Sequence, residues 1–283
     1  MKFAALESAL TPRLRQVTQL PAPLRILIFV LLLLLLWAPY ALLLNGLIAD
    51  KNLVSLLTMP LIYLLFLGLA QIWSRWGRGE GNPLPRYGMR RRRTWLYELL
   101  GGLGIGYGFL LLVFELLGAI GVVRWFNPIK PMPWLLLEGL VIAGGVALAE
   151  EIFFRGWLLD ELKRSYRPQV ALAATSLIYA VLHYLQLSPM SLQWFALALL
   201  GWTLGLAKQV TGGRLGLSVG IHAGLVWCYY VLNVGRLFQF TRQTPLWVSG
   251  FGLNPLAGAI GITVMAMLAI AMTISVKRQT KPA

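Results

Sequence analysis

The sequence predicts an all-α membrane protein, a polytopic bundle of about eight transmembrane helices with both termini in the cytosol. Hydrophobic residues make up 58% of the 283 positions and charged residues only 12%, and the mean hydropathy is +0.71. The apolar residues come in runs of about 20, the length that a helix needs to cross the hydrocarbon core of a bilayer. Lys and Arg gather in alternate loops, as expected when positive charge sets the orientation of a membrane protein.

Eight apolar segments are predicted to span the membrane. They cover about residues 24–47, 53–73, 95–118, 134–162, 169–185, 191–208, 215–234 and 255–276. The first is longer than the core of a signal peptide and lacks a convincing cleavage site, so we expect it to be retained. No long polar linker divides the chain, which predicts a single bundle over residues 24–276. Residues 1–23 are expected to form a cytosolic N-terminal segment, and residues 277–283 a cytosolic tail.

The loop charges support this count of spans. With the N-terminus inside, the predicted cytosolic segments hold 19 of the 25 Lys and Arg residues. Arg155 lies within a span, and the predicted outer segments hold only five: Lys51, Arg124, Lys130, Arg236 and Arg242. Losing or adding a span would mix the two groups, so the asymmetry favours eight.

Other features of the composition exclude some functions. The net charge of +15 would suggest nucleic acid in a soluble protein, but here it is explained by topology. The arginine run at residues 90–93 suits anionic lipid headgroups, and no nucleic-acid partner is expected. Cys228 is the single cysteine, which excludes an internal disulfide and a cysteine metal cluster. The third span is expected to pack closely against another helix through its glycines: Gly101, Gly102, Gly104, Gly106 and Gly108.

Two adjacent carboxylates, Glu150 and Glu151, end the apolar run that starts at Trp134. Ionised side chains are costly in hydrocarbon, so they are kept only where they are paired or face a polar cavity. Glu151 and Arg155 are four residues apart, share a helix face and are predicted to form an ion pair. Glu150 is turned about 100° away and has no partner three or four residues along the helix. The pattern predicts that Glu151 and Arg155 are scaffold and that Glu150 is the reactive group.

The only two histidines, His183 and His222, both lie inside predicted spans. Histidine suits lipid contact poorly, so each is expected to face the interior of the bundle. A carboxylate and two imidazoles that converge in a dry cavity could activate a water molecule or bind a divalent metal. The residues alone leave both possibilities open, beside a purely structural role for the imidazoles.

A family resemblance rests on the order of polar residues along successive spans: Glu150-Glu151-x-x-x-Arg155, then Tyr179-x-x-x-His183, then His222. This order resembles the CPBP family, the CAAX proteases and bacteriocin-processing enzymes, also called the ABI family, which includes the type II CAAX prenyl endopeptidases. The motifs of that family are EExxxR, FxxxH and HxxxN/D on successive core helices of an eight-span bundle. The resemblance covers about residues 134–234.

The resemblance implies an intramembrane endopeptidase that acts on a membrane-associated peptide or protein. It implies that Glu150 is the general base, polarising a water molecule for attack on a peptide carbonyl. His183 would help to hold that water, and His222 would stabilise the oxyanion of the tetrahedral intermediate. Glu151 and Arg155 would brace the helix and orient Glu150.

The sequence departs from the family pattern at two positions. Tyr179 stands where the family has Phe, which keeps the ring. Val226 stands four residues after His222, where the family has Asn or Asp, and removes an expected oxyanion donor. Ser218, one helical turn before His222, and the indole N–H of Trp227 are candidate substitutes. Val226 therefore favours a changed specificity or a member with little proteolytic activity.

Alternatives remain open from the sequence. Glu150, His183 and His222 could supply three ligands to zinc or another divalent cation, but the same three suit a metal-free glutamate base, and their spacing lacks the HExxH pattern. A non-catalytic membrane scaffold is the first rival function. A proton-coupled transporter is the second, although the chain shows no internal repeat. The expected location is a bacterial plasma membrane or an equivalent internal membrane.

Overall fold

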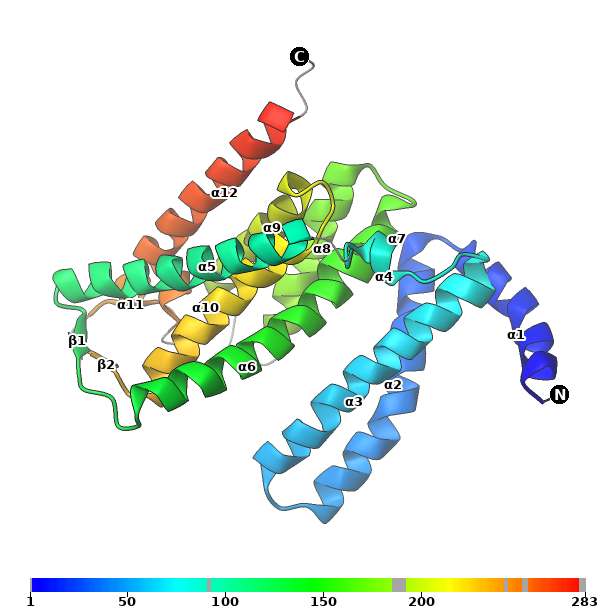
Figure 1. The fold of residues 1–283 in the computed structure, drawn as a ribbon, viewed down its shortest axis with the longest axis horizontal. Helices are drawn as coiled ribbons and strands as arrows, with labels where there is room; N and C mark the ends of the chain where they lie inside the picture. The colour runs from blue at the N-terminus through cyan, green and yellow to red at the C-terminus, as the bar shows by residue number, and fades with distance from the viewer. Residues whose placement is uncertain (1, 91–92, 185–191, 242–243, 251–253, 280–283) are drawn as a thin grey trace. The chain divides into compact units, whose positions relative to one another are not determined.

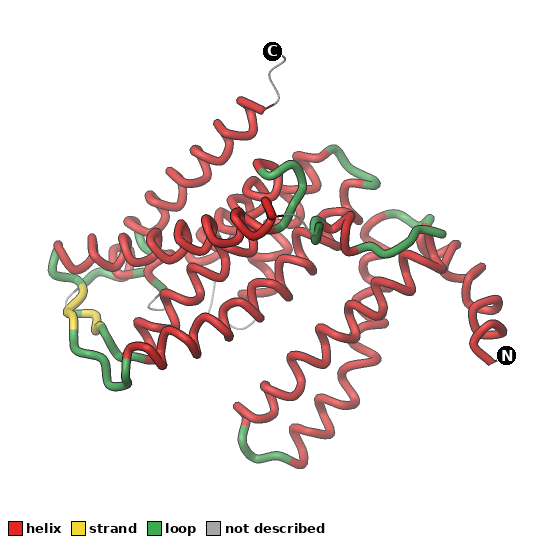
Figure 2. The backbone as a smooth tube through the Cα atoms, viewed as in Figure 1, coloured by secondary structure: helices red, strands yellow, loops and turns green. Residues whose placement is uncertain are grey.

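The computed structural model describes residues 2–90, 93–184, 192–241, 244–250 and 254–279. Figure 2 shows that helices dominate these residues, which confirms the all-α prediction. Parts of several predicted features lie outside the described residues: Arg91 and Arg92 of the arginine run, Leu185 and Ser191 at span ends, Arg242, and residues 280–283 of the tail.

The chain forms two compact units, Met1–Pro85 and Arg86–Ala283, each defined by its own internal contacts. The short helix α4 (Leu84–Tyr87) lies at the boundary in sequence. The grouping of residues 24–276 into a single bundle therefore stays a prediction.

The first unit is built on two long neighbouring helices. Its elements are α1 (Lys2–Thr18), α2 (Ala22–Leu47), α3 (Lys51–Ile72) and the π-helix η1 (Trp73–Gly77). Asp50 caps α3, because its carboxylate accepts the N–H of Asn52 at 2.8 Å. The buried ring of Phe29 on α2 packs edge-to-face on Trp73, with ring centroids 5.3 Å apart. Many leucines of α2 and α3 are exposed, as expected for helices that face lipid.

The second unit contains every predicted site residue, and Figure 1 labels its helices and strands. Its elements after α4 are α5 (Arg93–Ala119), β1 (Val123–Trp125), α6 (Met132–Glu151), the π-helix η2 (Ile152–Leu158), α7 (Leu159–Lys163), α8 (Pro168–Tyr184), α9 (Leu192–Val210), α10 (Gly216–Val234), β2 (Phe238–Phe240), α11 (Leu246–Ser249), the 3₁₀ turn η4 (Pro255–Ala257) and α12 (Ala259–Gln279). α6, η2 and α7 follow one another without a break, so the double-glutamate motif lies where an α-helix turns into a π-helix.

Glycines bring α5 and α10 into close contact. A Cβ on Gly106 would collide with the carbonyl oxygen of Ile221, and a Cβ on Gly220 with that of Leu99. Only glycine allows two helix backbones to approach this closely. The predicted packing face is thus confirmed at Gly102 and Gly106. Three of the five predicted glycines instead face open space: Gly101, Gly104 and Gly108.

A short antiparallel ribbon follows these two helices. Val123 of β1 lies opposite Phe240 of β2, and Trp125 lies opposite Phe238. Phe114 of α5 packs against Phe238 with ring centroids 4.5 Å apart. The ribbon, which the sequence analysis did not predict, therefore fixes the end of α10 against the end of α5, and α10 is the helix that carries His222.

Six helical segments among the described residues are long and apolar enough to cross a membrane. They are Ala22–Leu47, Lys51–Gly77, Arg93–Ala119, Met132–Lys163, Gly216–Val234 and Ala259–Arg278. The other two predicted spans coincide with α8 and α9. Helix α8 is apolar but shorter than the six segments above, and α9 is not among those six. The chain is therefore an integral membrane protein, while the count of eight and the cytosolic termini stay predictions.

Candidate active site

The double-glutamate motif places two neighbouring carboxylates in different surroundings. The side chain of Glu151 is fully buried, with 0% of its surface exposed, whereas 29% of the Glu150 side chain is exposed. Both lie on the last turn of α6, and Arg155 follows within η2. π-helical segments of this kind often occur at functional sites, because they rotate the following side chains relative to an unbroken α-helix.

Glu151 is held by three partners. Arg155 Nη1 donates to Glu151 Oε1 at 2.8 Å, which confirms the predicted ion pair. Ser218 of α10 donates its hydroxyl hydrogen to Glu151 Oε2. Nδ1 of His222, one helical turn along α10, lies 3.0 Å from Glu151 Oε1. A buried carboxylate with an arginine partner and further hydrogen bonds is stable as the charged form, so Glu151 has no free oxygen for chemistry.

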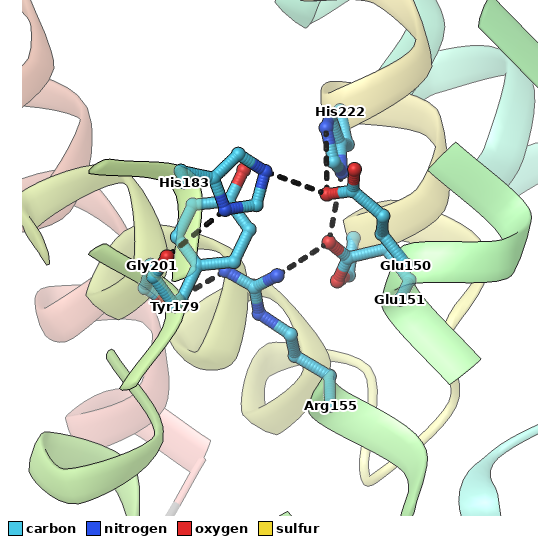
Figure 3. Close-up of polar contacts among 8 residues, drawn as sticks. Glu150, Glu151, Arg155, Tyr179, His183, Gly201 and His222 are labelled. Carbon is cyan, nitrogen blue, oxygen red and sulfur yellow. Dashed lines mark hydrogen bonds and ion pairs between the residues drawn. The ribbon is translucent and has the colours of Figure 1, made fainter. Parts of the chain in front are cut away.

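Arg155 connects this carboxylate to two further helices. Its Nη2 donates to the carbonyl oxygen of Gly201 on α9 at 3.2 Å. Its guanidinium carbon lies 4.4 Å from the centre of the Tyr179 ring on α8, within the range of a cation–π contact. Figure 3 shows Arg155 between Glu151 on one side and Tyr179 and Gly201 on the other. The residue therefore joins η2, α8 and α9 around one buried charge.

Glu150 has a different set of neighbours. Its Oε2 lies 3.2 Å from His183 Nε2 and 3.8 Å from His222 Nε2. Within the described residues this buried oxygen has no hydrogen-bond partner of normal geometry. Figure 3 shows the carboxylate of Glu150 facing the two imidazoles. The structure thus brings together the three groups that the sequence predicted to converge, and it leaves one carboxylate oxygen unsatisfied among them.

The second nitrogen of each imidazole fixes its tautomer. His183 Nδ1 lies 2.9 Å from the carbonyl oxygen of Tyr179, which only accepts, so Nδ1 carries a hydrogen. His222 Nδ1 faces the ionised Glu151 and carries a hydrogen for the same reason. In the neutral rings both Nε2 atoms then present lone pairs toward Glu150. Three acceptors that face one point need a proton, a water molecule or a cation between them.

Aromatic rings enclose the two imidazoles. The Tyr179 ring lies 4.0 Å from the His183 ring and 6.4 Å from the His222 ring, between centroids. Phe154 packs edge-to-face on Tyr179, with centroids 5.0 Å apart. Tyr179 is only 2% exposed. The aromatic residue of the second motif therefore sets the imidazole positions and keeps bulk water out of this side of the site.

Residues 132–238 match the family model described as type II CAAX prenyl endopeptidase Rce1-like. The match runs from α6 to β2 and includes every site residue described above. This part of the chain is similar to the CAAX protease family. The resemblance inferred over residues 134–234 is thereby confirmed. Neither a curated protein nor a solved structure matches the chain.

The two candidate oxyanion donors of this CAAX protease core are already engaged. Ser218 donates its only hydroxyl hydrogen to Glu151, so it supports the scaffold and is not free to bind an oxyanion. The indole N–H of Trp227 donates to the carbonyl oxygen of Leu136 on α6 at 2.9 Å. Val226 has no polar atom to offer. The prediction that Ser218 or Trp227 replaces the missing donor therefore does not fit this arrangement, because each would first have to break a hydrogen bond.

The metal alternative requires three ligands with suitable geometry. Among the described residues, no three His, Cys, Asp or Glu side chains are arranged as a metal-binding group. The metal-assisted and metal-free alternatives both stay predictions, and no step described below depends on a metal ion.

α9 carries two contacts of the CAAX protease core that the sequence analysis missed. Besides the Gly201 carbonyl, Lys208 Nζ donates to the carbonyl oxygen of Arg155 at 2.6 Å. Lys208 was counted only as a cytosolic loop charge. Its place at the end of a predicted span was a usable signal, because a lysine there has to find a partner. The Gly201 carbonyl has no signal in the sequence.

Proposed function

We propose that the protein is an intramembrane endopeptidase that hydrolyses a peptide bond of a membrane-associated substrate with a water molecule activated by Glu150. One observation carries this proposal. Glu150 Oε2 faces two imidazole nitrogens without a hydrogen-bond partner of its own, while the adjacent Glu151 is fully satisfied. The CAAX protease family of the core supports a membrane peptidase at the level of the family.

The chemistry follows from two acceptors, Glu150 Oε2 and His183 Nε2, which lie 3.2 Å apart. A water molecule between them donates one hydrogen to Glu150 and the other to the Nε2 of His183. Its lone pairs then point away from the carboxylate, toward a substrate carbonyl. As the water oxygen bonds to the carbonyl carbon, Glu150 takes up one proton, and the carbonyl π electrons move to oxygen. The same proton passes from Glu150 to the amide nitrogen as the C–N bond breaks, which leaves a carboxylic acid and an amine.

The role of His222 depends on its protonation. Stabilising an oxyanion requires a hydrogen on Nε2, and Nδ1–H is already directed at Glu151. His222 therefore acts as an imidazolium in this step, with the buried carboxylate of Glu151 balancing its charge. In this step Glu150 is the base and His222 is the donor to the oxyanion.

Cleavage by the purified protein tests the proposal. In detergent or liposomes, we expect turnover of at least one member of a panel of prenylated and transmembrane peptides. Glu150→Gln should reduce kcat by about 10²–10⁴-fold, the usual contribution of a general base, and His183→Ala should also reduce it. Glu115→Gln is the matched control, because Glu115 is an exposed acid of another apolar helix, α5. Equal rates in the Glu150 and Glu115 variants would overturn the assignment of the base.

Removal of metal ions separates the two hydrolytic chemistries. With Glu150 as the base, activity should persist after dialysis against a chelator. Loss of activity that added zinc restores would instead assign a metal-assisted reaction to the same residues.

Val226 favours one second candidate, a non-catalytic member that binds other membrane proteins. Without an amide or carboxyl group at this position, the oxyanion is left with His222 as its donor. A single donor of an oxyanion hole is worth about 10²–10³ in rate. Inactivity of the wild type and of both control and site variants on a broad peptide panel would favour the scaffold.

A further inference from the structure

Helix α9 lies outside the motifs of the active site, yet it holds Arg155 at two points. Gly201 O accepts from the guanidinium at 3.2 Å, and Lys208 Nζ donates to the backbone carbonyl of the same arginine at 2.6 Å. Gly201 and Lys208 are seven residues apart, which is about two helical turns, so they lie on one face of α9. One helix face therefore binds both the side chain and the backbone of Arg155.

The π-helical geometry explains why the Arg155 carbonyl needs an outside donor. In an α-helix, the N–H of Leu159 would bond to the carbonyl of Arg155, four residues earlier. Here that N–H bonds instead to the carbonyls of Phe154 and Gly156. The Arg155 carbonyl has thus lost its usual helical partner, and a buried carbonyl without a donor is destabilising. Lys208 supplies the hydrogen.

Lys208 is itself buried, with 7% of its surface exposed. A buried ammonium loses much of its hydration, and this cost has to be offset by the contacts that it makes. The hydrolytic step proposed above makes no use of Lys208, so its contact with η2 is the specific feature to explain. The contact lies at the residue whose guanidinium neutralises Glu151.

We infer that Lys208 is a positioning residue for the hydrolytic site, acting through Arg155 and Glu151 on His222. The contacts form a chain: the Lys208 ammonium holds the Arg155 backbone, Arg155 binds Glu151 Oε1, and the same oxygen accepts from His222 Nδ1. Loss of the ammonium lets η2 relax toward α-helical hydrogen bonding and turns Arg155 away from Glu151. The kinetic part of this inference rests on the proposed endopeptidase function.

Three variants test it. Lys208→Met keeps roughly the length of the side chain and removes the hydrogen-bond donor, whereas Lys208→Arg retains a donor. Lys163→Met is the control, because it removes an exposed lysine close to the motif in sequence. We expect Lys208→Met to lower kcat per folded active site about tenfold or more with little change in KM, since small displacements of catalytic groups are costly. Lys208→Arg should recover part of the loss, and Lys163→Met should behave as wild type. Wild-type kcat in Lys208→Met would overturn the inference.

A measurement without substrate separates failure of this inference from failure of the proposed function. The chain has only two histidines, so ¹⁵N-histidine labelling gives four ring nitrogen signals. The Nδ1 signal of His222 reports its hydrogen bond to Glu151. It should shift in Lys208→Met and stay unchanged in Lys163→Met, whether or not the wild type cleaves any peptide. An unchanged His222 signal in folded Lys208→Met would overturn the positioning role. So would a lower yield of folded Lys208→Met whose remaining folded protein has the kcat of wild type.

Discussion

Glu150 and Glu151 are consecutive in the chain, but their carboxylates differ in hydrogen-bond partners and in exposure. Around Glu151, an arginine, a serine and an imidazole occupy both oxygens, and no surface is exposed. Around Glu150, two imidazoles approach one oxygen that lacks a hydrogen bond, and part of the side chain is open. The buried ion pair of Glu151 thus lies directly beside a carboxylate oxygen that is left unsatisfied.

The largest effect on stability is expected from breaking the buried ion pair between Glu151 and Arg155. Arg155→Met leaves the carboxylate of Glu151 buried without its cation, and removal of one partner of a buried pair costs about 3–5 kcal/mol. Thermal or denaturant unfolding in detergent should show this loss. Glu150→Gln, measured in parallel, should leave the stability close to that of wild type, because Glu150 has no comparable ion pair.

Equal destabilisation by both substitutions would show that the two carboxylates are not divided into scaffold and reactive group. The double substitution Glu151→Leu with Arg155→Met provides a further control. It removes both charges of the ion pair and should be less destabilising than Arg155→Met alone, because the Glu151 carboxylate is not left buried without its arginine.

The next largest effect is expected at His222, whose two ring nitrogens lie near Glu150 and Glu151. His222→Phe keeps a ring next to Tyr179 and removes both nitrogens. We expect kcat to fall by about 10²–10³-fold, as for loss of an oxyanion donor. Steady-state cleavage by the folded variant checks this expectation. An unchanged kcat would assign the stabilisation of the oxyanion to another group.

Substitutions in the contact between α5 and α10 should have a smaller effect on stability, and only at glycines that touch the other helix. Gly106→Ala places a methyl group against the Ile221 carbonyl, next to His222, and should cost about 1–3 kcal/mol in stability. Gly104→Ala meets open space and should be neutral or slightly stabilising. The unfolding midpoints of the two variants check this contrast. Equal midpoints would mean that α5 and α10 are further apart in the membrane than described.

The smallest effect is a gain at Val226. Val226→Asn adds an amide one helical turn from His222, where the family has Asn or Asp. Because the new donor is not preorganised by neighbouring residues, we expect a gain of about tenfold in kcat, well below the full value of a donor. An unchanged or lower kcat, with the fold retained, would indicate that Val226 serves the substrate specificity of this chain and that the oxyanion needs no second donor.

Features that depend on local spacing were accessible from the sequence. The apolar runs located the helices, and the four-residue spacing of Glu151 and Arg155 predicted their ion pair. The lack of a helical partner for Glu150 predicted that its surroundings differ from those of Glu151, and their hydrogen bonds do differ. The two histidines were expected to face the interior and do lie beside Glu150, because polar groups within apolar spans have few other places to go.

Features that depend on contacts between distant segments were not accessible. The sequence could not show that Ser218 and Trp227 donate their hydrogens elsewhere, since their acceptors lie 67 and 91 residues away. Nor does any local pattern encode the π-helical turn after Glu151, which frees the carbonyl that Lys208 binds. The four-residue repeat of Gly216, Gly220 and Gly224 on α10, which packs against α5, was a usable signal that the sequence analysis missed.

An experimental density map of the protein in a lipid nanodisc, at a resolution that shows ordered solvent, tests the central claim most directly. The account predicts a single solvent peak within hydrogen-bond distance of Glu150 Oε2 and of an imidazole Nε2, with Glu151 bound to Arg155. A Glu150 carboxylate directed at acyl chains, or imidazoles too far from it to share one solvent molecule, would contradict the account.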